Sequence, residues 1–352
     1  MAFRPDHPAY FVNPRPQRFA FIGSGGEYFR IWIVNLFLSI ITLGIYSAWA
    51  KVRRERYFCA HTLLAGSPFS YHGQPMAILK GRVLAVLVVI GFNVVSQFAP
   101  MYSLLFLPAF LIAIPWAVRT SLRFKAANTS WRGVHFTFTA SMKESFAVIY
   151  GWGLLNILTL GLTMPASIRR WHKYIFNNLS FGGKKFDADP PLRGYYEPFI
   201  IPFVVILGVP LLIAATVRGG FSTEAASIGF LLPQIAALAA LFYLVLPLLF
   251  LAYVNVRIRN HLCDNLLLGH HGLSSDMRPA GMLWVLVRHG LPVPLTLGLY
   301  LPVLRVALTR YRVEHLQLYP AGSIDTFVAE RLEDQRALGE ELTDILDLDL
   351  GL

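Results

Sequence analysis

Charge is scarce in this chain, and its scarcity narrows the class of protein. Only 14% of the 352 residues are Asp, Glu, Lys or Arg, against about 25% in an ordinary soluble domain. The chain has just two cysteines, Cys59 and Cys263, whose spacing gives neither a disulfide framework nor a metal motif. We expect both to be buried free thiols. These shortages exclude a disulfide-rich secreted domain and make an ordinary soluble protein a poor fit.

Recognisable catalytic chemistry is also lacking. The ten histidines show no paired ligand spacing, so we expect no metal site. Asp264 and His270 share one loop, where a hydrogen-bonded interfacial turn is a better interpretation than an ion site. The Gly-rich run 23–26 has no Walker lysine after it, so a helix cap made by Ser24 is preferred to a phosphate loop. The sequence therefore predicts no catalytic residue and no cofactor, and a protein that is not an enzyme.

Apolar runs are what the chain has in excess. Those over 83–99, 104–118, 198–217 and 229–254 carry no charge, and a spanning helix needs roughly 17–25 apolar residues. Residues 1–18 have no early apolar core, so we expect no cleaved signal peptide. The sequence predicts a polytopic membrane protein.

The net charge is +11, and the basic residues gather at the ends of the apolar runs. That placement is typical of the positive-inside rule and of contact with anionic lipid headgroups. Nucleic acid is the competing partner for a basic chain, but cations that flank membrane segments do not form a soluble patch. We therefore expect the phospholipid bilayer and anionic headgroups as partners and no nucleic acid, and we leave a homo-oligomer open.

One pattern ends five apolar stretches: a cation, a polar residue five positions later, and usually Gly five further on. The copies are Arg56–His61–Gly66, Arg123–Asn128–Gly133, Lys173–Asn178–Gly183, Arg259–Asp264–Gly269 and Arg310–His315–Pro320. Two interpretations stay open. The cations reach helix C-terminal carbonyls while Gly makes a strand turn, or they bind lipid headgroups.

A second register relates parts of the chain by 117 residues. Thr42-Leu43-Gly44 recurs as Thr159-Leu160-Gly161, and once more, at a different spacing, as Thr296-Leu297-Gly298. Such registers predict internal duplication. The predicted segments are an N-terminal Pro/Arg-rich segment (1–18), unit A1 with a β-hairpin (19–73), transmembrane hairpin 1 with a post-helical strand (83–136), unit A2 (136–186), transmembrane hairpin 2 with a loop (199–272), unit A3 (281–319) and an acidic amphipathic tail (324–352).

Topology is limited by the basic ends. The three A units contribute one apolar segment each and the two transmembrane hairpins two each. If all seven segments crossed the membrane, successive basic ends would fall on opposite sides. The Leu-Gly pair in each A unit offers a break, because Gly costs about 1 kcal/mol relative to Ala inside a helix. Each A unit is then two half-length helices that dip in and return. The alternative is one continuous helix whose Gly packs against a neighbour.

The segments after the helices favour short strands. Residues 63–71, 131–138 and 178–186 mix aromatic and β-branched residues with Gly-containing turns. The predicted fold class is a membrane all-α bundle, polytopic, built from internal repeats, with short cytoplasmic β-hairpins after the helices. The tail is either an amphipathic helix against the basic cytoplasmic face or a solvated segment.

The sequence resembles the YjgN-like family of uncharacterised bacterial inner-membrane proteins. The resemblance runs from Phe19 to about Tyr319 and is most specific in GSGGEYFRIWIVNLFLSIITLGIYSAWAKVRRERYF, residues 23–58. Unit A3 departs most, because Leu299-Tyr-Leu-Pro302 stands where unit A1 has Ile45-Tyr-Ser-Ala48. The resemblance implies an inner-membrane location and no known activity, and the apolar runs predict that the protein is multi-pass.

Two functions therefore stay open. The first is a transporter or channel-like protein, for which Asn93 and Gln97, one helical turn apart in an apolar run, form a candidate intramembrane polar site. The second is a membrane scaffold or anionic-lipid-binding protein with a cytoplasmic platform, for which the five cations are the candidate residues.

Overall fold

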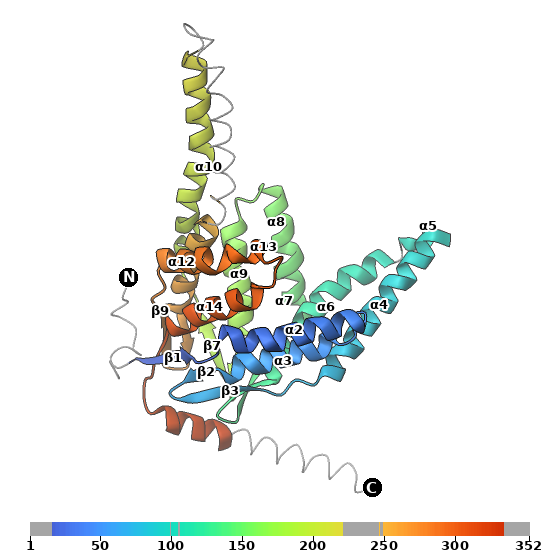
Figure 1. Cartoon of the computed structure of the whole chain (residues 1–352), viewed down its shortest axis with the longest axis vertical. Helices are drawn as coiled ribbons and strands as arrows, with labels where there is room; N and C mark the ends of the chain where they lie inside the picture. The colour runs from blue at the N-terminus through green and yellow to red at the C-terminus, as the bar shows by residue number, and fades with distance from the viewer. Residues whose placement is uncertain (1–15, 99, 105, 221–245, 247–248, 334–352) are drawn as a thin grey trace.

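Ten short strands close into one antiparallel barrel, and helices connect them (Figure 1). The computed structural model describes residues 16–98, 100–104, 106–220, 246 and 249–333. Around the barrel the order is β1-β10-β9-β8-β7-β6-β5-β4-β3-β2. Every strand thus pairs with its neighbours in the chain, and β1 pairs with both β2 and β10.

The strands alternate in length, five residues in the odd-numbered ones and three or four in the even-numbered ones. Their bounds are β1 Gln17–Phe21, β2 Thr62–Leu64, β3 Ser67–Tyr71, β4 Thr129–Trp131, β5 Val134–Phe138, β6 Leu179–Phe181, β7 Lys184–Ala188, β8 Leu266–Leu268, β9 His271–Ser275 and β10 Leu316–Tyr319. A helical segment follows each odd strand. We call the succession of odd strand, helical segment and even strand a unit, and number the five units in chain order.

Each helical segment leaves the barrel and returns to it. Its helices are α2 Gly25–Ile41 and α3 Ser47–Ala60 in unit 1; α4 Pro75–Phe98, α5 Pro100–Ser103 and α6 Phe106–Ala127 in unit 2; α7 Met142–Phe146, the π-helical turn η1 Ala147–Gly151, α8 Trp152–Leu158 and α9 Met164–Asn177 in unit 3; α10 Arg193–Gly220 and a helix over 249–263 in unit 4; and α12 Pro279–Gly290, α13 Pro292–Leu295 and α14 Leu301–Glu314 in unit 5.

Strand direction places all five helical segments at one rim of the barrel. Neighbouring strands are antiparallel, so the ends of odd strands and the starts of even strands share a rim. Every helical segment joins such an end to such a start. We call this the helical rim. The short turns between units lie at the opposite rim, the turn rim, where the last described helix also lies (Figure 1).

Units 1, 3 and 5 fold back at a Thr-Leu-Gly sequence. In unit 1, Leu43 and Gly44 both have positive φ, 50° and 90°. Gly44 N donates to Ser39 O (2.7 Å) and Leu43 N to Ile40 O (3.1 Å), which is the bonding pattern of a Schellman helix end. The Thr42 hydroxyl accepts from Tyr46 N at 2.9 Å, just ahead of the returning helix. Leu160–Gly161 and Leu297–Gly298 repeat the same φ signs, so the helix breaks predicted at these pairs are present.

The glycines of the basic pattern lie in the turns between units. Gly66 (φ 75°) follows Ala65 (φ 47°), and Gly133 (φ 83°) follows Arg132 (φ 48°). Two consecutive residues with positive φ make a type I′ turn, whose twist suits a two-residue hairpin connection. The sequence therefore carries Gly at these positions because of hairpin geometry.

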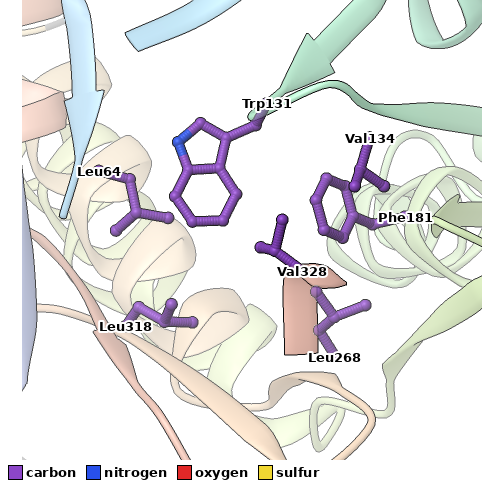
Figure 2. Packing of buried hydrophobic residues seen from close by; sticks show 7 residues of the cluster. All are labelled: Leu64, Trp131, Val134, Phe181, Leu268, Leu318 and Val328. Atoms are coloured by element: carbon purple, nitrogen blue, oxygen red, sulfur yellow. The ribbon is translucent and has the colours of Figure 1, made fainter. Parts of the chain in front are cut away.

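Apolar side chains fill the barrel interior. Figure 2 shows them converging from strands on different sides of the barrel and from the last helix. The buried members of this cluster are Leu64, Trp131, Val134, Phe181, Leu268, Leu318 and Val328. The remaining space among them and their aromatic neighbours is ≈ 90 Å³. The interior is therefore a packed core.

The helix over 324–333 closes the turn rim. Its Val328 is buried in the barrel core, and Phe327 stacks on Phe181 with ring centroids 6.2 Å apart. His271 meets Phe327 edge-on at 4.5 Å and its Nδ1 accepts a hydrogen bond from Ala321 N at 3.2 Å. Asp325 contacts Arg132 of the β4–β5 turn. The start of the predicted acidic tail thus packs into the apolar barrel, and residues 334–352 lie outside the described part.

The predicted fold class, a polytopic all-α membrane bundle with separate β-hairpins, is wrong. The strands form a closed ten-stranded barrel, because each isolated hairpin would leave two unpaired edges and neighbouring hairpins satisfy them. Among the described residues one helix, Pro75–Phe98, is long and apolar enough to cross a membrane.

We predict that acid loosens the tail helix. Burial lowers the pKa of His271 from its usual 6.5, so the neutral ring is favoured in the folded state. A lowered folded pKa contributes stability that is lost as pH falls below the unfolded value, and protonated Nδ1 can no longer accept from Ala321. Hydrogen exchange of residues 324–333, corrected for intrinsic rates, should speed up between pH 7.5 and 5.5. His271→Gln should remove most of this pH dependence, and equal protection of the wild type at both pH values contradicts the prediction.

Candidate functional site

A basic cavity lies near the helical rim, between α2, α3, α4 and α14. Its volume is ≈ 300 Å³, and it is lined by Tyr28, Trp32, Asn35, Leu36, Ser39, Ser47, Ala50, Lys51, Arg54, Arg82 and Arg305. Four of these residues are cations from three different units. At about 1.5 Å per helical residue, Lys51 and Arg305 stand roughly 14 Å beyond the barrel ends of their helices. The cavity therefore belongs to the helical layer and not to the barrel.

The four cations are only partly neutralised. Among the described residues only Arg54 of the four forms an ion pair, with Glu55 at 3.1 Å, and Lys125 shares that carboxylate at 3.7 Å. Arg82 bonds the Ser47 hydroxyl and Arg305 the Tyr28 hydroxyl. Burial, followed by the nearby Arg82 charge, lowers the pKa of Lys51. A lining of like charges favours a bound anion.

Asn35 adds an unsatisfied polar group to this lining. Asn35 is only 6% exposed, and its Oδ1 has no hydrogen-bond partner among the described residues. Buried polar atoms in proteins are nearly always bonded. The assignment of amide oxygen and nitrogen follows from the bonding network, so either amide atom can meet a ligand.

A second cavity shares three lining positions with the basic cavity at a shift of 117 residues, but its remaining wall comes from a different helix. It lies between α9, α10 and the helix over 249–263, has a volume of ≈ 570 Å³, and includes Met164, Ile168 and Phe199 in its lining. These positions correspond to Ser47, Lys51 and Arg82 of the basic cavity. Its other lining residues are mostly apolar, with His172 and Asn255 as exceptions. The two cavities therefore share equivalent positions on one returning helix and the helix after it, and differ in their other walls and in chemistry.

The five predicted cations sit near the barrel ends of the returning helices, and the structure does not bring them together. Arg56 lines an open groove with Arg30 and Arg53. Lys173 pairs with Asp189 at 2.7 Å, and Arg310 donates to Gly23 O at 2.8 Å. Arg123 and Arg259 are exposed.

The polar partners of these cations are helix C-caps or follow directly after the helix. Asn128 Nδ2 donates to Phe124 O at 2.7 Å and Asn178 Nδ2 to Tyr174 O at 3.0 Å. His61 and His315 bond the corresponding carbonyls, four residues back, at 2.7 Å. Asp264 differs because a carboxylate has no donor. It accepts instead from Ser274 Oγ at 2.8 Å, and burial raises its pKa.

The remaining candidate residues do not line the basic cavity. Asn93 is exposed and donates to Val89 O of its own helix, and Gln97 is exposed one turn on. No group of three or more metal-ligating side chains occurs within the described part of the chain. Both cysteines are free, as predicted, although only Cys263 is fully buried. Burial raises the pKa of Cys263 to about 12 and that of Cys59 to about 11.

Sequence reasoning missed the basic cavity, although a signal for it existed. Lys51 and Arg305 each stand five residues before a cation of the recurring pattern, where the other three units have Val118, Ile168 and Val254. An ionic residue at an otherwise apolar position is the expected mark of function in a membrane helix. Arg82, by contrast, looked like an ordinary flanking cation of an apolar run.

Known proteins match nearly the whole chain. Inner membrane protein YjgN of Salmonella typhimurium is 25% identical over 90% of this chain and 91% of its own length. Inner membrane protein YjgN of Escherichia coli O157:H7 is 32% identical over 44% of this chain and 39% of its own length. These names support an inner-membrane location. No solved structure matches the chain significantly. Residues 16–345 match the family described as bacterial protein of unknown function (DUF898), so the chain belongs to that family.

Proposed function

We propose that this protein is an inner-membrane, multi-pass, anionic-phospholipid-binding scaffold whose barrel forms a cytoplasmic platform, without catalytic activity. The helical rim faces the bilayer, the short hairpins of units 1, 3 and 5 dip into one leaflet, and the long helices α4 and α10, of units 2 and 4, cross the bilayer. The basic residues near the rim then lie at the cytoplasmic headgroups, as the positive-inside rule favours.

Three exposed leucines carry this proposal. Leu43, Leu160 and Leu297 are 94%, 95% and 95% exposed at the tips of their hairpins, and each has φ 50°. A left-handed conformation costs an L-residue other than Gly roughly 1–2 kcal/mol, and Gly or Asn usually occupies this position of a Schellman motif. No packing within the described protein offsets the cost. Insertion of the leucine side chain into hydrocarbon does.

Helix lengths agree with this arrangement. At 1.5 Å per residue, α4 is about 36 Å long, enough for a hydrocarbon core of about 30 Å. The returning helix α3 has 14 residues and is about 21 Å long. With Lys51 at headgroup level, the part beyond it enters only one leaflet. The dipping topology thus places every hairpin base on one side.

Basic residues near the rim support headgroup binding. Arg30, Arg53 and Arg56 line the open groove on α2 and α3. None of the three forms an ion pair within the described part of the chain. Each cation near an anionic membrane surface contributes about 1 kcal/mol. The groove therefore favours anionic over zwitterionic lipid.

Transport is the second candidate. The basic cavity lies among helices that carry exposed apolar surface, as a solute site between membrane helices does. A solute route has to run between the helices, because the described barrel interior is packed with aromatic and aliphatic side chains. A lipid-binding scaffold needs no such route, which is why it is preferred.

We predict that the hairpin tips lie in hydrocarbon. A nitroxide attached at Leu43→Cys or Leu160→Cys, in a Cys59→Ser background, should collide readily with oxygen and poorly with a water-soluble nickel chelate in lipid nanodiscs. Buried Cys263 stays unlabelled because its pKa is raised to about 12. The matched control is Lys185→Cys on β7, which should show water-like accessibility. Water-like accessibility at both tips contradicts the dipping arrangement.

We also predict selective retention of anionic lipid. Native mass spectrometry of detergent-purified protein should show more bound phosphatidylglycerol than phosphatidylcholine. Arg53→Ala with Arg56→Ala should weaken this binding roughly 30-fold if each cation contributes about 1 kcal/mol. Arg193→Ala serves as the control, because Arg193 is already paired with Glu197 at 2.6 Å. Equal retention of both lipids by the wild type contradicts anionic selectivity.

The transport candidate has a separate test. Proteoliposomes should then release a trapped small anion faster than protein-free liposomes, and Lys51→Ile should slow the release severalfold. Asn93→Ala is the comparison, since Asn93 donates to Val89 O of its own helix and does not line the basic cavity. Release at the protein-free rate, for phosphate, chloride and organic anions alike, removes this candidate.

A further inference from the structure

Two cavities in this fold share equivalent lining positions and differ in charge. Each lies beside a returning helix and the helix that follows it, α3 with α4 and α9 with α10, and both include positions related by 117 residues. Lys51 and Arg82 in one correspond to Ile168 and Phe199 in the other. The helices α9 and α10 thus form with apolar residues at the places where α3 and α4 carry these two cations. The basic residues are therefore not a requirement of folding.

Their presence in the basic cavity has an electrostatic cost. Lys51, Arg54 and Arg82 are partly buried, and Glu55 pairs with Arg54 while Lys125 competes for it. Close like charges that lose water destabilise one another unless an opposite charge compensates them. Among the described residues, Glu55 is the one carboxylate that pairs with any of the four cations. The remaining excess of positive charge favours a negatively charged occupant.

We propose that the basic cavity binds a phosphate group, with Lys51, Arg82 and Arg305 as its principal ligands. Two guanidinium groups present the planar donor forks that match phosphate oxygens, and the ammonium group adds a point charge. Asn35, with its unsatisfied amide oxygen, accepts a hydroxyl next to the phosphate.

The source of that phosphate follows from the location of the cavity. It lies roughly 14 Å from the barrel, and the leucine tips lie beyond it toward hydrocarbon. This is the level of lipid headgroups if the proposed membrane arrangement holds, so the inference rests on that arrangement in naming an anionic phospholipid with a hydroxyl-bearing headgroup. A soluble phosphate ester has the same binding chemistry, and the experiment separates the two sources.

The test uses the full chain in detergent with three probes: short-chain phosphatidylglycerol, short-chain phosphatidylcholine and inorganic phosphate. Binding is measured by isothermal titration below the micelle-forming concentration of the lipids. We expect phosphatidylglycerol to bind and Lys51→Ile with Arg82→Phe to weaken its binding at least tenfold. These substitutions copy the residues of the apolar cavity, so the variant should fold. Arg305→Gln is a second, milder variant for which we expect a loss of severalfold. Arg123→Ala, an exposed cation of another unit, should leave binding within twofold of the wild type.

The outcomes distinguish this inference from the proposed function. Inorganic phosphate binding that depends on Lys51 and Arg82, without lipid binding, supports the site with a soluble source. Phosphatidylglycerol binding that is unchanged by both cavity variants but lost in Arg53→Ala with Arg56→Ala overturns the cavity site and leaves the scaffold proposal standing. Water-exposed leucine tips overturn the membrane arrangement even where phosphate still binds in the cavity.

Discussion

Satisfaction of strand edges is the constraint on which this structure depends. A hairpin of a three-residue and a five-residue strand leaves backbone donors and acceptors unpaired along both edges, and such a hairpin is marginal alone. Here each hairpin pairs with the next, and β1 pairs with β10 to close the ring. Closure has a directional consequence. Because the strands alternate in direction, every long connection leaves from one rim and every tight turn from the other.

That direction gives the helical layer its polarity. Five helical segments extend from one rim, so their bases share one level and their tips point away from the barrel. Apolar side chains are exposed along the outer parts of α2, α4, α8 and α10, whereas Arg56, Lys173 and Arg310 stand close to the rim. A water-soluble protein hides such apolar surface, and large exposed patches mark interaction sites. Basic residues thus lie close to the rim of the barrel, and exposed apolar residues lie farther from it. All helix bases lie on the same side of the helical layer whether or not a helix crosses a bilayer.

Local features were predictable from the sequence because their causes are local. The Leu-Gly breaks follow from helix-end chemistry, and the strands near 63–71, 131–138 and 178–186 follow from turn glycines between apolar and aromatic residues. His61 and Asn128 were recognised as recurring partners, and a four-residue hydrogen bond explains their spacing. Closure of the barrel was not predictable, since pairing of β1 with β10 joins residues about 300 positions apart. The basic cavity was missed for the same reason: Arg305 meets Lys51 only after the ring closes.

Two features of the helical layer are unfavourable in water and become favourable in one common environment. Leu43 holds a left-handed conformation with its side chain exposed, and Lys51, eight residues later, shares a cavity with Arg82 and Arg305. A local explanation of the Leu43 conformation does not explain the cluster of cations around Lys51. Their positions link them, because Leu43 lies in the turn just before α3 and Lys51 lies about one helical turn into that helix, on its way back to the barrel. In the proposed arrangement, a bilayer with anionic headgroups supplies hydrocarbon at the level of the leucine and negative charge at the level of the lysine, so that one placement of the barrel accounts for both.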